Sequence, residues 1–138
     1  MIKKILITGG AGFIGLHLAI RLLGEGHRVH LVDNMTRAVF DPEFNEVIKN
    51  KNIEFSNLDI MSNENLKILD KDFDFIFHLA AIIGVRHVLE RPYNVLYDNL
   101  QMLGNIIDFS HQQTNLSRLF FASTSEIYAG TLKHFNLP

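Results

Sequence analysis

Residues 3–15 read Lys-Lys-Ile-Leu-Ile-Thr-Gly-Gly-Ala-Gly-Phe-Ile-Gly, an apolar run that ends abruptly in closely spaced glycines. The apolar part predicts a buried strand. The glycines fit G-x-G-x-x-G when read from Gly10 and G-x-x-G-x-x-G when read from Gly9. Glycines at this spacing let the backbone turn tightly and come close to a pyrophosphate. The stretch therefore predicts a strand that leads into a phosphate-binding turn.

An amphipathic helix is predicted directly after the glycines. Its apolar residues recur at helical spacing and share one face: Ile14, Leu18, Leu22 and Leu23. The first amides of such a helix point at a bound phosphate with the positive end of the helix dipole. This arrangement favours a nucleotide cofactor.

A second strand is predicted over residues 29–32, and it ends at Asp33. A carboxylate about 20 residues past the glycines can accept both ribose hydroxyls of NAD and repels the extra phosphate of NADP. The alternative is a solvated aspartate that caps the next segment. Arg37 favours NADP, because a guanidinium can pair with the 2′-phosphate. On balance the sequence predicts NAD in preference to NADP.

The rest of the chain continues the alternation of strands and helices, with no linker or internal repeat. Further strands are predicted at 53–58, 73–79 and 118–122, helices at 42–49, around Leu66 and at 93–109, and a loop at 37–40. This order implies right-handed crossovers and an α/β fold, a Rossmann-type doubly wound parallel sheet with helices on both faces. Ligands of such sheets lie beyond the carboxyl ends of the strands. We therefore expect one edge to gather Gly9, Asp33, Asp59, Ala80 and Ser123.

Composition agrees with a single cytoplasmic globular domain. The chain has 138 residues, of which 47% are hydrophobic, a formal charge of -2 and no cysteine. The balanced charge argues against nucleic acid as a partner, and no apolar stretch reaches the ~18 residues that a membrane span needs. The seven histidines are scattered without the spacing of a zinc site, so no metal is expected.

Five segments resemble the extended short-chain dehydrogenase/reductases of the NAD-dependent epimerase/dehydratase type, which epimerise, dehydrate or decarboxylate nucleotide sugars. They are residues 8–15, 33–34, 59–60, 78–81 and 123–128. In that family they form the glycine motif, the ribose acceptor pair, the adenine contact, the fourth-strand motif and the fifth-strand motif. The resemblance implies that NAD is bound by Gly9, Gly12, Phe13, Ile14, Gly15, Asp33, Asn34, Thr36, Arg37, Asp59, Ile60, Leu79, Ala80, Ala81, Asn99 and Ser123.

The same resemblance implies catalytic roles for Thr124, Ser125 and Glu126. The hydroxyl at the position of Thr124 hydrogen-bonds the reacting sugar oxygen in the family. An acid at the position of Glu126 is typical of dehydratases and decarboxylases, some uronate epimerases carry one, and many 4-epimerases have a neutral residue there. A surface carboxylate or a helix-turn cap is the alternative for Glu126.

The family's Tyr-x-x-x-Lys motif does not occur in this sequence. The positions four beyond Tyr93, Tyr97 and Tyr128 hold Tyr97, Gln101 and Leu132. We therefore expect residues 1–138 to be an NAD-binding domain that stops before that motif and before the substrate-binding region, and to be inactive alone. The intact lyase or isomerase would bind a nucleotide sugar, and a homodimer through helix 93–109 is possible. The alternative is a non-catalytic NAD-binding module or sensor.

Overall fold

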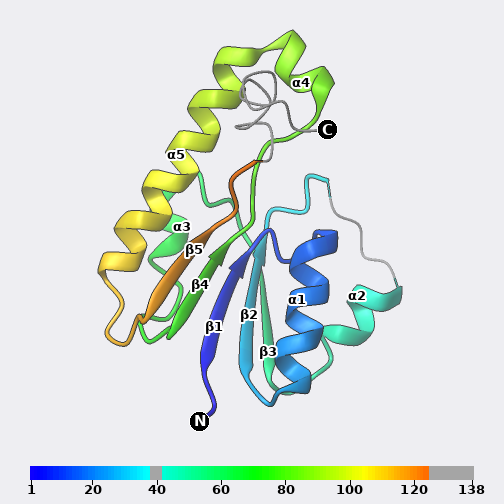
Figure 1. Ribbon diagram of the computed structural model, residues 1–138, viewed down its shortest axis with the longest axis vertical. Coiled ribbons are helices and arrows are strands. Elements are labelled where there is room, and N and C mark those ends of the chain that lie inside the picture. Colours follow the sequence, from blue (N-terminus) through cyan, green and yellow to red (C-terminus); the bar gives the residue numbers. More distant parts are fainter. Residues whose placement is uncertain (38–41, 125–138) are drawn as a thin grey trace, which may run out of the picture.

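A parallel five-stranded sheet forms the centre of the fold in the computed structural model, which describes residues 1–37 and 42–124. Within these residues the strand order is β3-β2-β1-β4-β5 (Figure 1). The strands are β1 (Lys4–Thr8), β2 (Arg28–Asp33), β3 (Ile53–Asn57), β4 (Phe75–His78) and β5 (Arg118–Phe121). The chain therefore runs outward from β1 in one direction, returns, and runs outward in the other. This reversal confirms the predicted doubly wound sheet.

Helices cover both faces of the sheet, as the alternation of elements predicted. They are α1 (Phe13–Gly24), α2 (Pro42–Val47), α3 (Asn63–Leu66), α4 (Val85–Glu90) and α5 (Pro92–His111). One core cluster joins α1 and α2 to the sheet, with Leu16 and Phe44 at its centre. The other joins α3 and α5 to the opposite face, with Leu66 and Ile106 buried. The two clusters bury apolar residues of β1 and β2 on both faces of the sheet, which explains the continuous apolar run from Ile5 to Ile7 and the run in β2 that only His30 interrupts.

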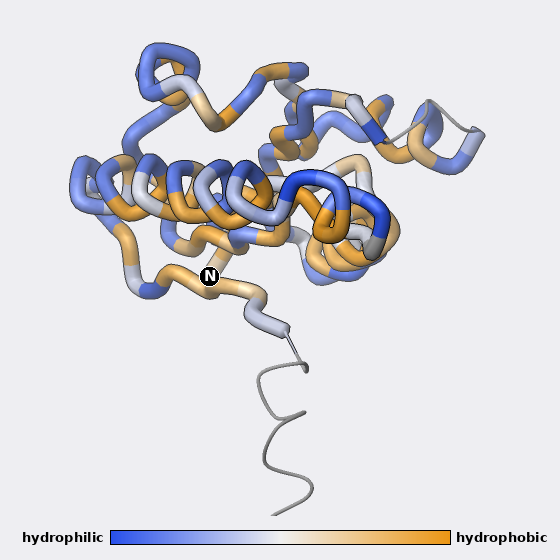
Figure 2. The backbone as a smooth tube through the Cα atoms, turned by 90° about the horizontal axis from the view of Figure 1, so that it is seen from above, coloured by the Kyte–Doolittle hydropathy of each residue, from blue (hydrophilic) through white to orange (hydrophobic). Residues whose placement is uncertain are grey.

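Alternation along β1 shows how one strand serves both layers. Ile5 and Ile7 pack on the α1 side, whereas Leu6 between them packs on the α5 side. Along the long helix α5 in Figure 2, apolar residues (orange) lie mainly on one side and polar residues (blue) mainly on the other. This helix therefore needs the sheet to bury the apolar residues of its inner face.

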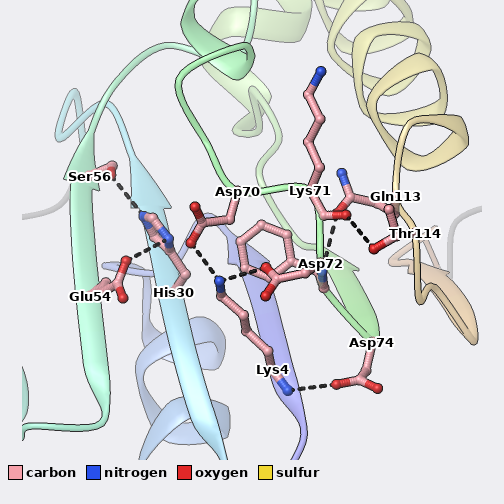
Figure 3. A network of polar contacts seen from close by, with 11 residues as sticks. Lys4, His30, Glu54, Ser56, Asp70, Lys71, Asp72, Asp74, Gln113 and Thr114 are labelled. Carbon is pink, nitrogen blue, oxygen red and sulfur yellow. Dashed lines mark hydrogen bonds and ion pairs between the residues drawn. The ribbon is translucent and has the colours of Figure 1, made fainter.

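Ion pairs hold the amino-terminal end of β1 to the segment before β4 (Figure 3). The ammonium group of Lys4 donates to the carboxylates of Asp70 and Asp72, and its backbone N–H donates to Asp74 Oδ2 at 2.9 Å. Lys3 Nζ lies 2.8 Å from Asp74 Oδ1. The hydrogen bond to Lys4 is the main cause that lowers the pKa of Asp70. These contacts lie at the end of β1 away from the glycines.

Two helices differ from the sequence-based expectation. The sequence predicts no helix between the strand at 73–79 and the helix at 93–109, but the segment with Arg86 and His87 forms α4, which begins after Gly84 and is followed directly by α5 at Pro92. The helix expected through Leu66 and Leu69 is only one turn long and ends at Leu66, and residues 67–69 form a turn. The loop predicted at 37–40 lies outside the described residues from residue 38 on. None of the helices in the described ranges combines the length and apolarity needed to cross a bilayer.

Candidate cofactor-binding site

The glycine turn connects β1 to α1 at the carboxyl edge of the sheet. The backbone of Gly9 has φ +72°, and its N–H donates to Val32 O of β2 at 2.8 Å. A Cβ atom on Gly9 would lie 2.8 Å from the backbone nitrogen of Ala80, just after β4. The turn therefore passes so close to the neighbouring strand end that a side chain has no room.

The first turn of α1 lies at this edge and has backbone amide groups without partners in the helix. The first hydrogen bond of the helix runs from Leu16 N to Gly12 O at 2.9 Å. The N–H groups of Phe13, Ile14 and Gly15 precede it and have no acceptor within the helix. Their orientation at the positive end of a 12-residue helix suits an anion.

Asp33, the last residue of β2, accepts a backbone hydrogen bond at each of its two carboxylate oxygens. Its Oδ2 accepts a hydrogen bond from Ala11 N at 3.1 Å, and its Oδ1 accepts one from Met35 N at 2.9 Å. Met35 has φ +56°, so the chain leaves β2 through a left-handed residue. A carboxylate has about four acceptor positions, so these two bonds hold Asp33 in place and leave it acceptor capacity.

An open cavity of about 810 Å³ lies along this edge, within the size range of small-molecule and cofactor sites. Fourteen of the predicted cofactor residues line it: Gly9, Gly12, Phe13, Ile14, Gly15, Asp33, Asn34, Thr36, Arg37, Asp59, Ile60, Leu79, Ala80 and Ala81. Four residues expected to converge, Gly9, Asp33, Asp59 and Ala80, are therefore brought together. The fifth, Ser123, directly follows the lining residue Ala122.

Two further predicted residues that the structure describes, Asn99 and Thr124, do not line the cavity. Asn99 of α5 accepts from Ile82 N at 2.8 Å and donates to Ile82 O at 3.0 Å, so its side-chain amide ties the segment after β4 to the helix. Thr124 is exposed at the same edge as the end of β5. Ser125 and Glu126 lie outside the described residues. The roles of these residues stay predictions.

Several lining residues were not among the predicted cofactor residues. Met61 and Ile82 are immediate neighbours of predicted segments, so their place beyond a strand end was the signal that could have found them. Asp98 and Met102 come from α5 and carry no such local signal. His87 and Arg91 line the cavity as well, which brings a fixed positive charge to it.

His78, the last residue of β4, is a buried histidine beneath this edge. It is 2% exposed, and its Nδ1 lies 2.7 Å from Thr8 Oγ1. Burial lowers the pKa of His78 to about 4. Ala80 N donates to Thr8 Oγ1 at 3.4 Å. A hydroxyl oxygen has two lone pairs as well as its own hydrogen, so the bond between Thr8 and His78 is compatible with either ring tautomer, and the lowered pKa makes the ring neutral at pH 7.

The strand order, the glycine turn at a helix N-terminus and the acid at the end of β2 together define a dinucleotide-binding domain of the Rossmann class. Residues 5–135 match the NAD dependent epimerase/dehydratase family. The chain belongs to this family.

Individual relatives agree with this assignment. The chain is 37% identical over 128 residues to a UDP-N-acetyl-alpha-D-glucosaminuronate decarboxylase from Bacillus cytotoxicus, a match that covers 93% of the chain and 38% of the decarboxylase. A UDP-Glc/GlcNAc 4-epimerase from Campylobacter jejuni has a similar structure, with a TM-score of 0.81 and 28% identity over 91% of this chain and 38% of that one. A UDP-glucose 4-epimerase from Thermus thermophilus, in complex with NAD, gives a TM-score of 0.74 and 30% identity over 88% and 37%. The chain thus spans about two fifths of the length of these relatives.

Proposed function

We propose that this chain is the NAD-binding portion of a cytoplasmic nucleotide-sugar epimerase, dehydratase or decarboxylase that works by transient oxidation of the sugar. The observation that carries the proposal is the cavity that joins the glycine turn, Asp33 and the ends of β3 and β4 at one edge of the sheet. Its residues fit a dinucleotide, because helix amides suit the pyrophosphate and a fixed carboxylate suits a ribose. The family and the activities named for the relatives support the same interpretation.

Each part of the cavity has a task in this proposal. The amides of Phe13, Ile14 and Gly15 bind the pyrophosphate, and Asp33 accepts the adenosine ribose hydroxyls. Asp59 and its neighbours form the adenine wall. When bound, NAD supplies a hydride acceptor, and the protein's share is to hold it in register with the sugar.

The reaction depends on residues at the end of β5. Thr124 would hydrogen-bond the reacting sugar oxygen, Glu126 would move a proton during elimination or decarboxylation, and Ser125 would share in the catalysis. A tyrosine and a lysine beyond Pro138 would complete the lyase or isomerase.

The second candidate is a non-catalytic NAD-binding module. A Tyr-x-x-x-Lys motif in the reading frame after Pro138 favours the enzyme, and a stop codon there favours the module.

The 138-residue chain is expected to bind NAD at least about tenfold more tightly than NADP. The carboxylate of Asp33 is held by two backbone N–H groups, so it cannot swing away from a 2′-phosphate without losing both bonds. Calorimetric titration with each dinucleotide measures the ratio. Replacement by asparagine, Asp33→Asn, should narrow the ratio because it removes the repelling charge and keeps an acceptor. Equal or tighter NADP binding by the parent chain would show that Arg37 outweighs Asp33.

A glycine variant tests whether NAD binds in the proposed cavity. Gly12 has φ -77°, and a Cβ there would meet only Gly9 O, at 3.2 Å, so the fold should accept Gly12→Val with a small loss of stability. The added side chain would occupy space in the cavity and should weaken NAD binding by a factor of about 100, or roughly 2.7 kcal/mol. Gly24→Ala is the matched control, because a Cβ at Gly24 meets nothing within 4 Å. Parent-like NAD affinity in Gly12→Val would remove the glycine turn from the binding site.

A homodimer through α5 is part of the proposal. The outer side of this helix exposes five large apolar side chains, with exposed fractions between 39% and 75%: Tyr93, Leu96, Tyr97, Leu100 and Ile107. The first four recur at spacings of three and four, and Ile107 lies two turns beyond Leu100, so the five form one stripe. A stripe of this kind on a helix whose inner face already covers the sheet suits pairing with a second copy.

We expect Leu100→Glu to shift the chain from dimer to monomer in sedimentation velocity runs at increasing concentration. Leu100 is 59% exposed in the middle of the stripe, and a carboxylate buried there without a partner opposes association. Ile68→Glu serves as the control, because Ile68 is 75% exposed outside α5. A parent chain that stays monomeric at all concentrations contradicts the dimer, as does a dimer that Leu100→Glu leaves intact.

A further inference from the structure

Asn105 is a fully bonded polar residue in the core beside the candidate site. It lies on the inner face of α5 and is 2% exposed. Its Nδ2 donates to two backbone carbonyls, Ile60 O and Met61 O, both at 2.8 Å. Its Oδ1 accepts a hydrogen bond from Gln101 Nε2, one helical turn earlier, at 2.9 Å. A buried amide with all of these partners has one orientation available to it.

The two carbonyls belong to the segment that leaves β3 and forms one wall of the cavity. Leu58, Asp59, Ile60 and Met61 all line the cavity, and none of them lies in a strand or helix. Other hydrogen bonds also shape this segment: Met61 N donates to Asp59 Oδ1 at 2.9 Å, Asn65 Nδ2 donates to Asp59 O at 2.8 Å, and Leu58 N donates to Asp33 O of β2 at 3.1 Å. The contacts with Asn105 differ from these, because they tie the far end of the segment, at Ile60 and Met61, to a helix 44 and 45 residues further along the chain.

We propose that Asn105 is a positioning residue for the adenosine half of the dinucleotide, acting through the 58–61 wall. The inference rests on the proposed function, which gives this wall to the adenine. A wall held before the ligand arrives saves the free energy of ordering it during binding. Without Asn105 the carbonyls of Ile60 and Met61 lose their donor at the protein core, and the segment must move to find another.

The test compares Asn105→Leu with the parent 138-residue chain. Leucine has the same branched shape, is somewhat larger and has no donor, so it fills the site in the helix packing while the wall loses its anchor. We expect NAD to bind about tenfold more weakly and AMP to weaken by a similar factor, with the affinity for nicotinamide mononucleotide unchanged. Calorimetry at a temperature where both chains are folded measures all three ligands. Amide NMR signals should shift at residues 58–61 and stay in place at residues 9–15.

Gln113→Leu is the matched control. Gln113 Oε1 accepts from Phe73 N at 3.2 Å and its Nε2 donates to Phe109 O at 3.1 Å, so it also ties a backbone segment to α5. That segment lies before β4, at the opposite edge of the sheet from the cavity. This variant should lose stability and keep the parent's affinity for NAD. Equal weakening of NAD binding by both variants would show general destabilisation and overturn the positioning role.

The outcomes separate the inference from the proposed function. If the parent chain binds no NAD, the proposed function and this inference fail together. If the parent binds NAD and Asn105→Leu binds it equally well, or loses nicotinamide mononucleotide instead of AMP, only the inference fails. Should Asn105→Leu not fold, Asn105→Ser takes its place, since a hydroxyl can still donate to one carbonyl. A loss of about threefold or more in NAD affinity is then expected, and parent-like affinity would overturn the inference.

Discussion

Gly15→Ala is expected to destabilise the fold by more than about 3 kcal/mol. A Cβ at this position of α1 would lie 2.3 Å from Gly9 O and 2.9 Å from the Cα of Gly10. Both are backbone atoms of the turn before the helix, so no side-chain rotation relieves the contact, and either the turn or the helix must move. Overpacking of well-packed sites costs about 1–3 kcal/mol, and a contact this short with backbone lies at the upper end or beyond. Urea unfolding followed by circular dichroism measures the loss.

The matched control for this variant is Gly104→Ala, another glycine within a helix. A Cβ at Gly104 meets nothing within 4 Å, so alanine there should stabilise α5 by up to about 1 kcal/mol through its higher helix propensity. Both variants replace glycine by alanine, and we expect them to change the free energy of unfolding in opposite directions. A Gly15→Ala variant as stable as the parent would mean that α1 does not pack as closely on the turn as the structure has it.

The second large effect is a loss of stability in mild acid, caused by His78. Burial lowers the pKa of this histidine to about 4 in the folded chain, whereas the ordinary value for an unfolded chain is 6.5. Between these two values the unfolded chain binds a proton that the folded chain does not. The free energy of unfolding therefore falls as the pH falls from 6.5 to 4, by about 3 kcal/mol for this group.

Unfolding by urea at several pH values between 4.5 and 7.5 measures this slope. His78→Asn is the informative variant, because an asparagine can still reach Thr8 but does not titrate. We expect lower stability at neutral pH and a flatter dependence on pH. Some slope should remain, since burial also lowers the pKa of His30 and acts in the same pH window. Asp70 and Asp74 have lowered pKa values too, and their contribution is lost only below about pH 4. An unchanged slope in His78→Asn would exclude this histidine as the cause.

Much of the fold was predictable because its signals are local. The apolar runs of β1 and β2, the glycines and Asp33 follow one another in the first quarter of the chain, and each predicts its own structure without reference to distant residues. The parallel order followed from the alternation of elements and the handedness of crossovers. Most of the cavity residues were predictable for the same reason, since strand ends of a parallel sheet meet at one edge.

The parts that were missed depend on distant contacts or weak local patterns. The helix α4 has six residues, and the residue before it, Gly84, has φ +115°, so neither length nor cap marks its start. Asn105 binds backbone groups 44 and 45 residues away, and nothing in its immediate sequence indicates those partners. Met102 reaches the cavity only because α5 crosses the sheet beside it. Such contacts depend on how separate elements pack together, and the local sequence pattern does not predict that packing.

Thr8, the last residue of the central strand, contacts two neighbouring strands, whereas the ends of the outer strands contact only one. On one side it pairs with Val32 of β2, and on the other it pairs with His78 of β4, to which its hydroxyl is also bonded. A change at Thr8 is therefore transmitted to both halves of the edge at once. A change at the end of β3 or β5 reaches one neighbour alone. We therefore expect substitutions to be tolerated better at the ends of the outer strands, both in natural relatives and in designed variants. There a substitution can alter the binding of one half of the ligand and leave the binding of the other half unchanged.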